Sequence, residues 1–557
     1  MSGVLRETEV DGVRCFWVDT ARPTLNAQLS FRAGLADGRL AQSGWLHLLE
    51  HSALHGRGVG SLQVNGSVGV LSTQFDVHGP ADRVARVMSE IAGWLAAPEF
   101  EGLERERRVL QAEARLRRGP ARASFVWRYG SLGLGMVSNG EPGLGLATAS
   151  GLSALAGTVF VRSNAVLALD GPPPAGLRLA LPEGAYQPVP PAGSGEAGSQ
   201  MYRDESGLVL SGVATASRAA MCCPPMLQRA IREWLRDREG AAYAPWSMYE
   251  QLDAEKALVL AGSDVAANSQ DFLLGDVLDL LHRLNADGIP EPWLDEYREE
   301  LLQRMADPHA MAAPAWRSAS RVLLGGQPQD LDAAIEEVKL VNTSSVRDAV
   351  LEVCETLLVG VPHKTVRDPR LPEMDFPSSD QPPEGQTFLS VNAPADTSFL
   401  TLTADDLAVT SHTGTLSLPI RTAAALYVYP DGQRTLIDKD GWSLSIDPAR
   451  WRNGHDAVAL LDDAVPPDLH LPQPTPDNPS TFEQAPFLQR WWLHLRRKDS
   501  FWLLVAILFT PLVYGISVLV AAQLPDPTTQ MIIRAEPAWI TVFAVAYMYN
   551  RYARGRR

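Results

Sequence analysis

The segment SGWLHLLEHSALHG, residues 43–56, combines residue types and a spacing that could hold a metal ion and activate water. His47 and His51 are four residues apart, so on a helix they share one face with their Cβ atoms about 5–6 Å apart. This separation suits two imidazole ligands of one tetrahedral zinc ion. Glu50 could accept a proton from a water molecule beside the metal. The pattern H-x-x-E-H therefore predicts a hydrolytic zinc site with Glu50 as general base, the alternative being an amphipathic helix with surface histidines.

A third protein ligand is expected from elsewhere, because catalytic zinc sites hold three protein ligands and leave the fourth position open. The run GLERERRVLQAEARLRR, residues 102–118, places Glu106 and Glu113 seven residues apart. Seven residues are two helical turns, so both carboxylates lie on one face of a helix. A solvated charged helix is the ordinary explanation of such a run. The residues alone leave the two explanations open.

The first part of the chain resembles the M16 metallopeptidase family of pitrilysin, insulinase and mitochondrial processing peptidase. The resemblance rests on FRAGLADGRLAQSGWLHLLEH, HGPADRVARVMSEIAGWLAAPEF, ERERRVLQAE and VFVRSNAVLALDG. It implies that Glu113 is the third zinc ligand and that Glu106 supports the site from behind the ligands. The interval from His51 to Glu113 is shorter than is usual in the family. The shortening falls around residues 57–65, so it affects the substrate-side edge strand near residues 64–70 rather than the metal ligands.

A second α/β unit at residues 205–362 repeats the order of the first, with a strand at 207–213, a helix at 225–236, a strand at 257–266 and further helices. This order predicts a diverged internal duplication. Within it, Arg236 and Tyr243 resemble the family's arginine–tyrosine pair, which binds the substrate backbone and the tetrahedral intermediate. Core packing is the other explanation of Tyr243. The resemblance covers residues 5–360 and implies a two-chain clamshell, either a homodimer or a heterodimer with another M16-like chain.

The expected fold class is α+β, and proline-rich linkers divide the chain. Asp-Gly pairs at 431–432 and 440–441 mark turns between short strands, and one helix follows them. This pattern predicts a small β domain that resembles a bacterial pleckstrin-homology-like (PH-like) module. The predicted organisation is a catalytic zinc domain at 1–171, a linker at 172–204, a substrate-binding domain at 205–362, a linker at 363–385, the small β domain at 386–463, a linker with a basic juxtamembrane segment at 464–500, and a transmembrane hairpin at 501–557.

Residues 501–524 are uncharged and mainly apolar, and they exceed the roughly 20 residues that a helix needs to cross a bilayer. A second apolar stretch at 537–550 is short, so it is either a second span, at about 535–551, or an interfacial helix. Arginine and lysine residues precede the first stretch and arginines follow the second, which places both ends inside the cell. The N-terminus has no secretory signal. We therefore expect a multi-pass protein of the cell membrane with its catalytic part on the cytoplasmic side.

The composition excludes some other classes of protein. The net charge of -16 argues against nucleic acid as a partner, because binding phosphates requires a basic face. The four cysteines form no C-x-x-C pair, so neither a disulfide framework nor a zinc ribbon is expected.

The sequence as a whole predicts a membrane-anchored zinc endopeptidase that cleaves peptides or unfolded segments. Extended peptides could pair with an exposed sheet edge. Two alternatives remain. One is a catalytically silent M16-like subunit with a structural or binding role, and the other is a membrane-tethered adaptor in which peptidase activity is secondary.

Overall fold

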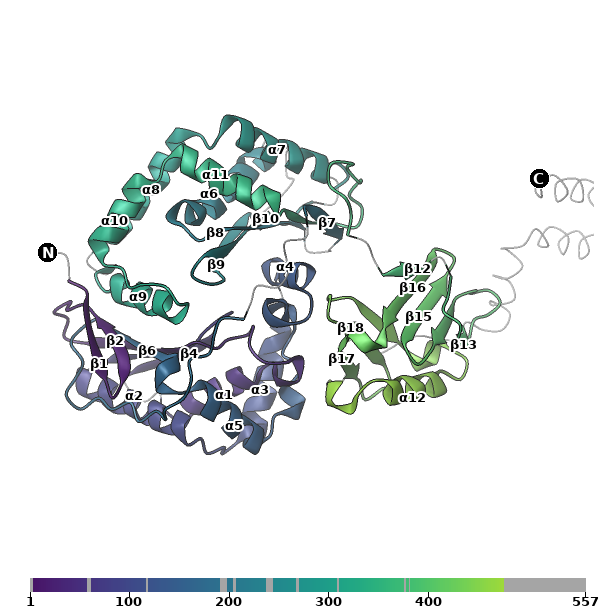
Figure 1. Cartoon of the computed structure of the whole chain (residues 1–557), viewed down its shortest axis with the longest axis horizontal. Coiled ribbons are helices and arrows are strands. Elements are labelled where there is room, and N and C mark those ends of the chain that lie inside the picture. Colours follow the sequence, from purple (N-terminus) through teal and green to yellow (C-terminus); the bar gives the residue numbers. More distant parts are fainter. Residues whose placement is uncertain are drawn as a thin grey trace, which may run out of the picture. The chain divides into compact units, whose positions relative to one another are not determined.

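The computed structural model describes residues 4–57, 62–116, 119–190, 198–203, 207–236, 244–266, 270–307, 310–374, 377–379 and 381–474 (Figure 1). None of the helices in these ranges combines the length and the apolarity that crossing a bilayer requires. The predicted spans at 501–524 and about 535–551 lie outside the described residues. Tyr243 and the side chain of Arg236 also lie outside them.

The first α/β unit is built on a six-stranded sheet in the order β1-β2-β6-β3-β5-β4. Buried and partly buried residues alternate along β5 and the first part of β3, as expected for strands that face a core on one side, and the last three residues of β3 are all buried. Apolar residues of α1, α2 and α5 pack on that side with Leu29, Phe31 and Phe75 (Figure 1). The strands are β1 (Arg6–Val10), β2 (Val13–Trp17), β3 (Leu25–Phe31), β4 (Gln63–Val68), β5 (Thr73–Gly79) and β6 (Ala165–Leu169), and the helices are α1 (Trp45–Leu54), α2 (Ala81–Ala96), α3 (Leu103–Leu116), α4 (Pro120–Tyr129) and α5 (Ala149–Val159).

The second α/β unit has a five-stranded sheet in the order β7-β11-β8-β10-β9. Its strands run in the same relative directions as β2-β6-β3-β5-β4: the first pair is parallel and the following pairs are antiparallel. This matching topology is what an internal duplication produces. The strands are β7 (Gln200–Arg203), β8 (Leu208–Thr215), β9 (Trp246–Gln251), β10 (Lys256–Ser263) and β11 (Leu358–Val361), and the helices are α6 (Arg218–Arg236), α7 (Leu273–Asp287), α8 (Glu291–Ala306), α9 (Ala313–Leu323), α10 (Leu331–Leu340) and α11 (Thr343–Glu355).

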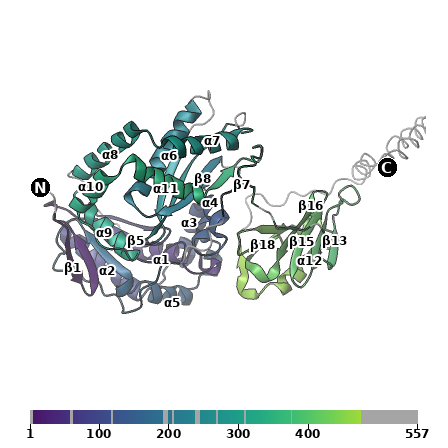
Figure 2. The same ribbon diagram turned by 45° about the horizontal axis from the view of Figure 1, so that its top comes forward.

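The two α/β units pack against each other through both helices and sheets. Helix α9 covers the second face of the first sheet, where Ala315 and Ala319 contact Phe16 and Val166 (Figure 2). From α4, the buried Arg128 donates hydrogen bonds to the Ser211 carbonyl at 2.8 Å, the Ser211 hydroxyl at 3.0 Å and the Thr356 carbonyl at 2.9 Å. These contacts make the two α/β units one packed body.

Residues 378–474 form two further sheets and one helix. One sheet has the order β12-β16-β15-β14-β13 and the other the order β19-β18-β17-β20. Within the described residues, 418–445 and 464–474 belong to the same compact unit as the two α/β units, whereas 378–417 and 446–463 form a second unit. The predicted small domain at 386–463 thus contributes to both. Its elements are β12 (Ser378–Ser379), β13 (Gln386–Leu389), β14 (Phe399–Leu402), β15 (Asp406–Ser411), β16 (Gly414–Pro419), β17 (Ala423–Val428), β18 (Arg434–Asp438), β19 (Ser443–Ile446), α12 (Gly454–Ala464) and β20 (His470–Pro472).

Candidate metal centre

Helix α1 presents the H-x-x-E-H motif on the side of the helix that faces α3 and β4. The helix begins at Gly44, whose φ of 89° lies in the left-handed region that favours glycine. A Cβ atom at Gly44 would come within 2.8 Å of Leu144 and 2.9 Å of Glu141. Glycine therefore allows α1 to start directly against the segment that contains Glu141 and Leu144. Leu48 and Leu49, which are fully buried, fix the helix on the sheet.

Four of the predicted side chains converge at one point. The His47 and His51 rings lie 4.8 Å apart and nearly perpendicular. His47 Nε2 is 3.9 Å from Glu50 and 3.9 Å from Glu113, and His51 Nε2 is 3.8 Å from Glu50 and 3.9 Å from Glu113. Ligand atoms around a tetrahedral zinc lie about 3.3–3.5 Å apart, since each metal–ligand bond is about 2.0–2.1 Å. The Glu113 carboxylate thus lies about half an ångström further from each imidazole nitrogen than it would around a zinc ion. The ligand atoms of His47, Glu50 and His51 all lie within 4.8 Å of one another.

Each histidine is held from behind by a carboxylate. His47 Nδ1 lies 2.8 Å from Glu141 Oε1, and His51 Nδ1 lies 3.4 Å from Glu106 Oε2. Glu106 also lies 3.3 Å from His55 Nδ1. A carboxylate at Nδ1 fixes the tautomer that leaves the lone pair on Nε2, which is the form that binds a metal. The donor set and its supporting carboxylates fit a zinc ion.

The surroundings of His51 favour its neutral form. Burial lowers the pKa of His51, and the neighbouring His47 lowers it further, while Glu113 and Glu106 act in the opposite direction. His47 and Glu50 are buried, with exposures of 2% and 4%, whereas the Glu113 side chain is 37% exposed. The site is therefore open to solvent on the side of Glu113.

Among the described residues, strand β4 is an edge strand of the first sheet, and it lies beside Glu50. It pairs with β5 from Gln63 opposite His78 to Val68 opposite Thr73, so the short interval after α1 still leaves a regular edge strand near the predicted position. Gly66 of β4 is in tight contact with the Glu50 carboxylate, because a Cβ there would lie 2.1 Å from Glu50 Oε1. The strand thus borders the proposed base directly.

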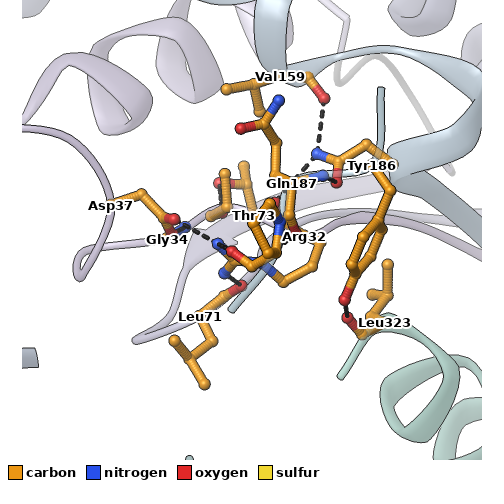
Figure 3. A network of polar contacts seen from close by, with 12 residues as sticks. Arg32, Gly34, Asp37, Leu71, Thr73, Val159, Tyr186, Gln187 and Leu323 are labelled. Carbon is orange, nitrogen blue, oxygen red and sulfur yellow. Dashed lines mark hydrogen bonds and ion pairs between the residues drawn. The ribbon is translucent and has the colours of Figure 1, made fainter. Parts of the chain in front are cut away.

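A buried arginine fixes the turn at residues 34–37 (Figure 3). Gly34 and Asp37 of this turn line a small cavity together with His47. Arg32 is fully buried, donates to the Leu71 carbonyl at 2.5 Å, and forms an ion pair with Asp37. Asp37 in turn accepts a hydrogen bond of 2.7 Å from the Gly34 amide. Arg32 Nε also donates to the Gln187 carbonyl at 3.2 Å. The network ties the turn at 34–37 to the segment that leaves the first α/β unit.

The structure brings together His47, Glu50, His51, Glu113 and Glu106, the five residues that the sequence assigns to the metal site. Glu141 was missed, because no motif marks it and it lies 94 residues beyond His47 in the chain. The substrate-binding roles of Arg236 and Tyr243 stay predictions.

Comparison with known proteins finds similar solved structures but no match to a family model or a curated protein. Among solved structures, a protease from Helicobacter pylori has a TM-score of 0.54 at 14% identity, over 65% of this chain and 100% of that one. A peptidase M16 inactive domain from Pseudomonas fluorescens has a TM-score of 0.52 at 13% identity, over 67% of this chain and 100% of that one.

A chain of complex III2 from Candida albicans also aligns, with a TM-score of 0.52 at 14% identity over 64% of this chain and 96% of that one. At such identities the likeness describes the fold alone, and one neighbour is named as an inactive domain. The arrangement of residues around α1 must therefore decide the chemistry. In its fold, this chain is similar to the M16 family peptidases, as its sequence resemblance predicts.

Proposed function

We propose that this chain is a zinc-dependent endopeptidase that cleaves peptides or unfolded segments. The observation that supports this most is the convergence of His47 Nε2, His51 Nε2 and the Glu113 carboxylate opposite Glu50, with a carboxylate behind each imidazole. Bound zinc would lower the pKa of a water molecule toward 7 and polarise the scissile carbonyl. Such a reaction requires a general base and three metal ligands close together, and Glu50 and the three proposed ligands are arranged in this way.

The chain's own residues would perform the remaining steps. Glu50, 3.8 Å from His51 Nε2 and 3.9 Å from His47 Nε2, lies where it can accept a proton from the attacking water and pass it to the leaving amine. The free edge of β4 offers backbone N–H and C=O groups to an extended peptide. A substrate added there as a strand would lie beside Glu50, because Gly66 is in contact with that side chain.

Further parts of the proposal rest on the sequence. We propose a cell-membrane anchor at 501–524 and about 535–551, a cytoplasmic catalytic part, a small PH-like β domain, and a homodimer or heterodimer in which Arg236 and Tyr243 bind substrate. Membrane fractionation of the full chain, with and without an alkaline wash, tests the anchor. Recovery of the full chain in the soluble fraction would contradict it.

The test of the activity compares the full chain with its Glu50→Gln variant, using zinc content and cleavage of an unstructured fluorogenic peptide. We expect one zinc per chain in both proteins and a loss of about 10²–10⁴-fold in cleavage for the variant, because the amide cannot act as a base. Glu113→Gln should weaken zinc binding. Glu104→Gln, on the exposed face of the same helix α3, serves as the matched control and should change neither property.

The catalytically silent alternative makes a different prediction. A silent subunit would bind zinc without cleaving any peptide, and Glu50→Gln would then leave every measured property unchanged. The absence of zinc from the full chain after purification without chelators and after reconstitution would contradict the metal site itself.

A further inference from the structure

Glu141, which contacts His47, has a left-handed backbone conformation that must be stabilised by the residues packed around it. It is 7% exposed, its Oε1 lies 2.8 Å from His47 Nδ1, and its φ of 58° is in the left-handed region. A non-glycine residue adopts this conformation at a cost in free energy, so it persists where the surroundings hold it. The position of this carboxylate therefore depends on what packs around residues 139–146.

This segment has little regular structure of its own. It follows one short 3₁₀ helix, Gly133–Ser138, and contains another, Leu144–Leu146. On one side the first α/β unit holds it, since the Trp45 indole donates to the Gly143 carbonyl at 3.0 Å. Gly143 also passes so close to Ala41 that a Cβ would lie 2.5 Å from the Ala41 carbonyl oxygen. One side of the segment is thus fixed by α1 and the residues before it.

The other side is held by strands from the C-terminal part of the chain. The Tyr427 hydroxyl of β17 donates to Asn139 Oδ1 at 3.2 Å, and the Gln473 amide, just after β20, donates to the Pro142 carbonyl at 3.1 Å. Asn139 and Pro142 lie on either side of Glu141 in sequence. The two hydrogen bonds therefore bracket the residue whose carboxylate supports the metal ligand.

Apolar packing reinforces these two bonds. Ala425 of β17 and Leu471 of β20 are buried together with Leu40 and Met136. Before this segment in the chain, the Ser131 amide donates to the Lys439 carbonyl at 2.9 Å. All of these residues belong to one compact unit of the structure. Strands β17 and β20 thus pack beside the segment that contains Glu141.

We propose that β17 and β20 hold Glu141 against His47 and thereby set the affinity of the site for zinc. This inference rests on the proposed function, because it assumes that His47 binds zinc. The route runs from Tyr427 and Gln473, through residues 139–142, to the hydrogen bond at His47 Nδ1. Glu141 is a positioning residue, and the strands act through it. Supporting carboxylates of this kind change metal affinity by about 10- to 100-fold when they are removed.

The test measures the zinc dissociation constant of the metal-free full chain by competition with a chromogenic chelator. Glu141→Ala should weaken zinc binding by about 10- to 100-fold. Tyr427→Phe combined with Gln473→Met removes both bracketing hydrogen bonds with little change in side-chain volume, and it should weaken zinc binding about tenfold. Thr435→Val is the matched control, because it removes a hydroxyl of the adjacent strand β18 that bonds to Ser445. It should leave the affinity unchanged.

A double-mutant cycle distinguishes this route from general destabilisation. If the strands act through Glu141, the double substitution should have less than a twofold effect on zinc binding in the Glu141→Ala background, because coupled residues are not additive. Hydrogen exchange of the amides at 139–146 should become faster in the Tyr427→Phe/Gln473→Met variant. A merely structural contribution would lower the melting temperature and leave zinc affinity unchanged.

Three outcomes would overturn the inference. Zinc affinity that is unchanged by the double substitution would show that the strands do not position Glu141, even in a chain that binds zinc and cleaves peptide. Fully additive effects would show that they act on the site by another route. A wild-type chain that binds no zinc would overturn the proposed function and this inference with it.

Discussion

The substitution Gly66→Ala tests the proposed role of Glu50 as base. The three atoms nearest to the added methyl group all belong to Glu50. A Cβ built on Gly66 lies 2.1 Å from Glu50 Oε1 and 2.8 Å from its Cδ and Cγ. The backbone of Gly66 is not in the left-handed region, so alanine fits the strand itself. Ordinary van der Waals contact begins at 3.4 Å, so the Glu50 carboxylate must move by about 1.3 Å, the difference between 3.4 and 2.1 Å.

A displacement of this size should cost about 10²-fold in kcat, since catalysis depends steeply on the position of the reacting groups. That factor corresponds to about 2.7 kcal/mol in the activation free energy. The proposed zinc ligands His47, His51 and Glu113 are not among the nearest contacts of the new methyl group. Zinc content and zinc affinity of Gly66→Ala should therefore equal those of the wild-type chain.

The assay is cleavage of the fluorogenic peptide over a range of concentrations, with zinc content measured on the same samples. Gly69→Ala is the matched control on the same edge, because its nearest new contact is the Ser72 carbonyl oxygen at 3.5 Å, an ordinary distance. It should retain full activity. A folded Gly66→Ala chain with wild-type kcat would refute the placement of Glu50 as base, and loss of zinc would show that β4 supports the ligands instead.

Two further predictions concern stability and pH. Arg128→Met should lower the free energy of unfolding by about 3 kcal/mol in chemical denaturation, because it removes three hydrogen bonds from a buried cation to Ser211 and Thr356, whereas Ser211→Ala, which removes one, should cost about 1 kcal/mol. Equal losses in both variants would contradict the assignment of these bonds. Burial raises the pKa of Glu250 to about 7, so the folded state keeps a proton that the unfolded state loses near pH 4.5, and stability should fall by at most about 3 kcal/mol as pH rises from about 4.5 to 7. Glu250→Gln should remove that fall and be more stable than wild type at pH 8, and an identical pH profile in both chains would contradict it.

The part of the site that the sequence predicts is the part that local geometry determines. His47, Glu50 and His51 share one helix, so their spacing alone fixes which face they occupy. Glu113 and Glu106 also share one helix, but their meeting with α1 depends on tertiary packing, and only the family resemblance indicated it. Neither helical spacing nor the family resemblance indicated Glu141. It lies outside regular helices and strands, and it meets His47 through tertiary packing.

One helix and one strand outside the metal site also differ from the prediction. The sequence suggests a helix from residue 225, since proline favours the first turn, yet α6 begins at Arg218 and contains both Pro224 and Pro225. Buried apolar residues such as Cys223 and Leu227 hold that helix together on the sheet. The short strand β13 was missed, because three of its four residues are exposed and give no apolar alternation.

The set of residues that would hold the metal is likewise determined by the folded structure, because residues far apart in the sequence contribute to it. All predicted ligands lie before residue 114, and the fold similarity covers 64–67% of the chain, so the N-terminal two-thirds could be expected to suffice. The segment that carries Glu141 nevertheless accepts hydrogen bonds from Tyr427 and Gln473, nearly 300 residues or more further along: Tyr427 bonds to Asn139 and Gln473 to Pro142. A supporting carboxylate acts only when its own backbone is fixed, and here part of that fixation comes from β17 and β20. The unit that would hold the metal is therefore discontinuous, and linkers in the sequence do not mark its boundary.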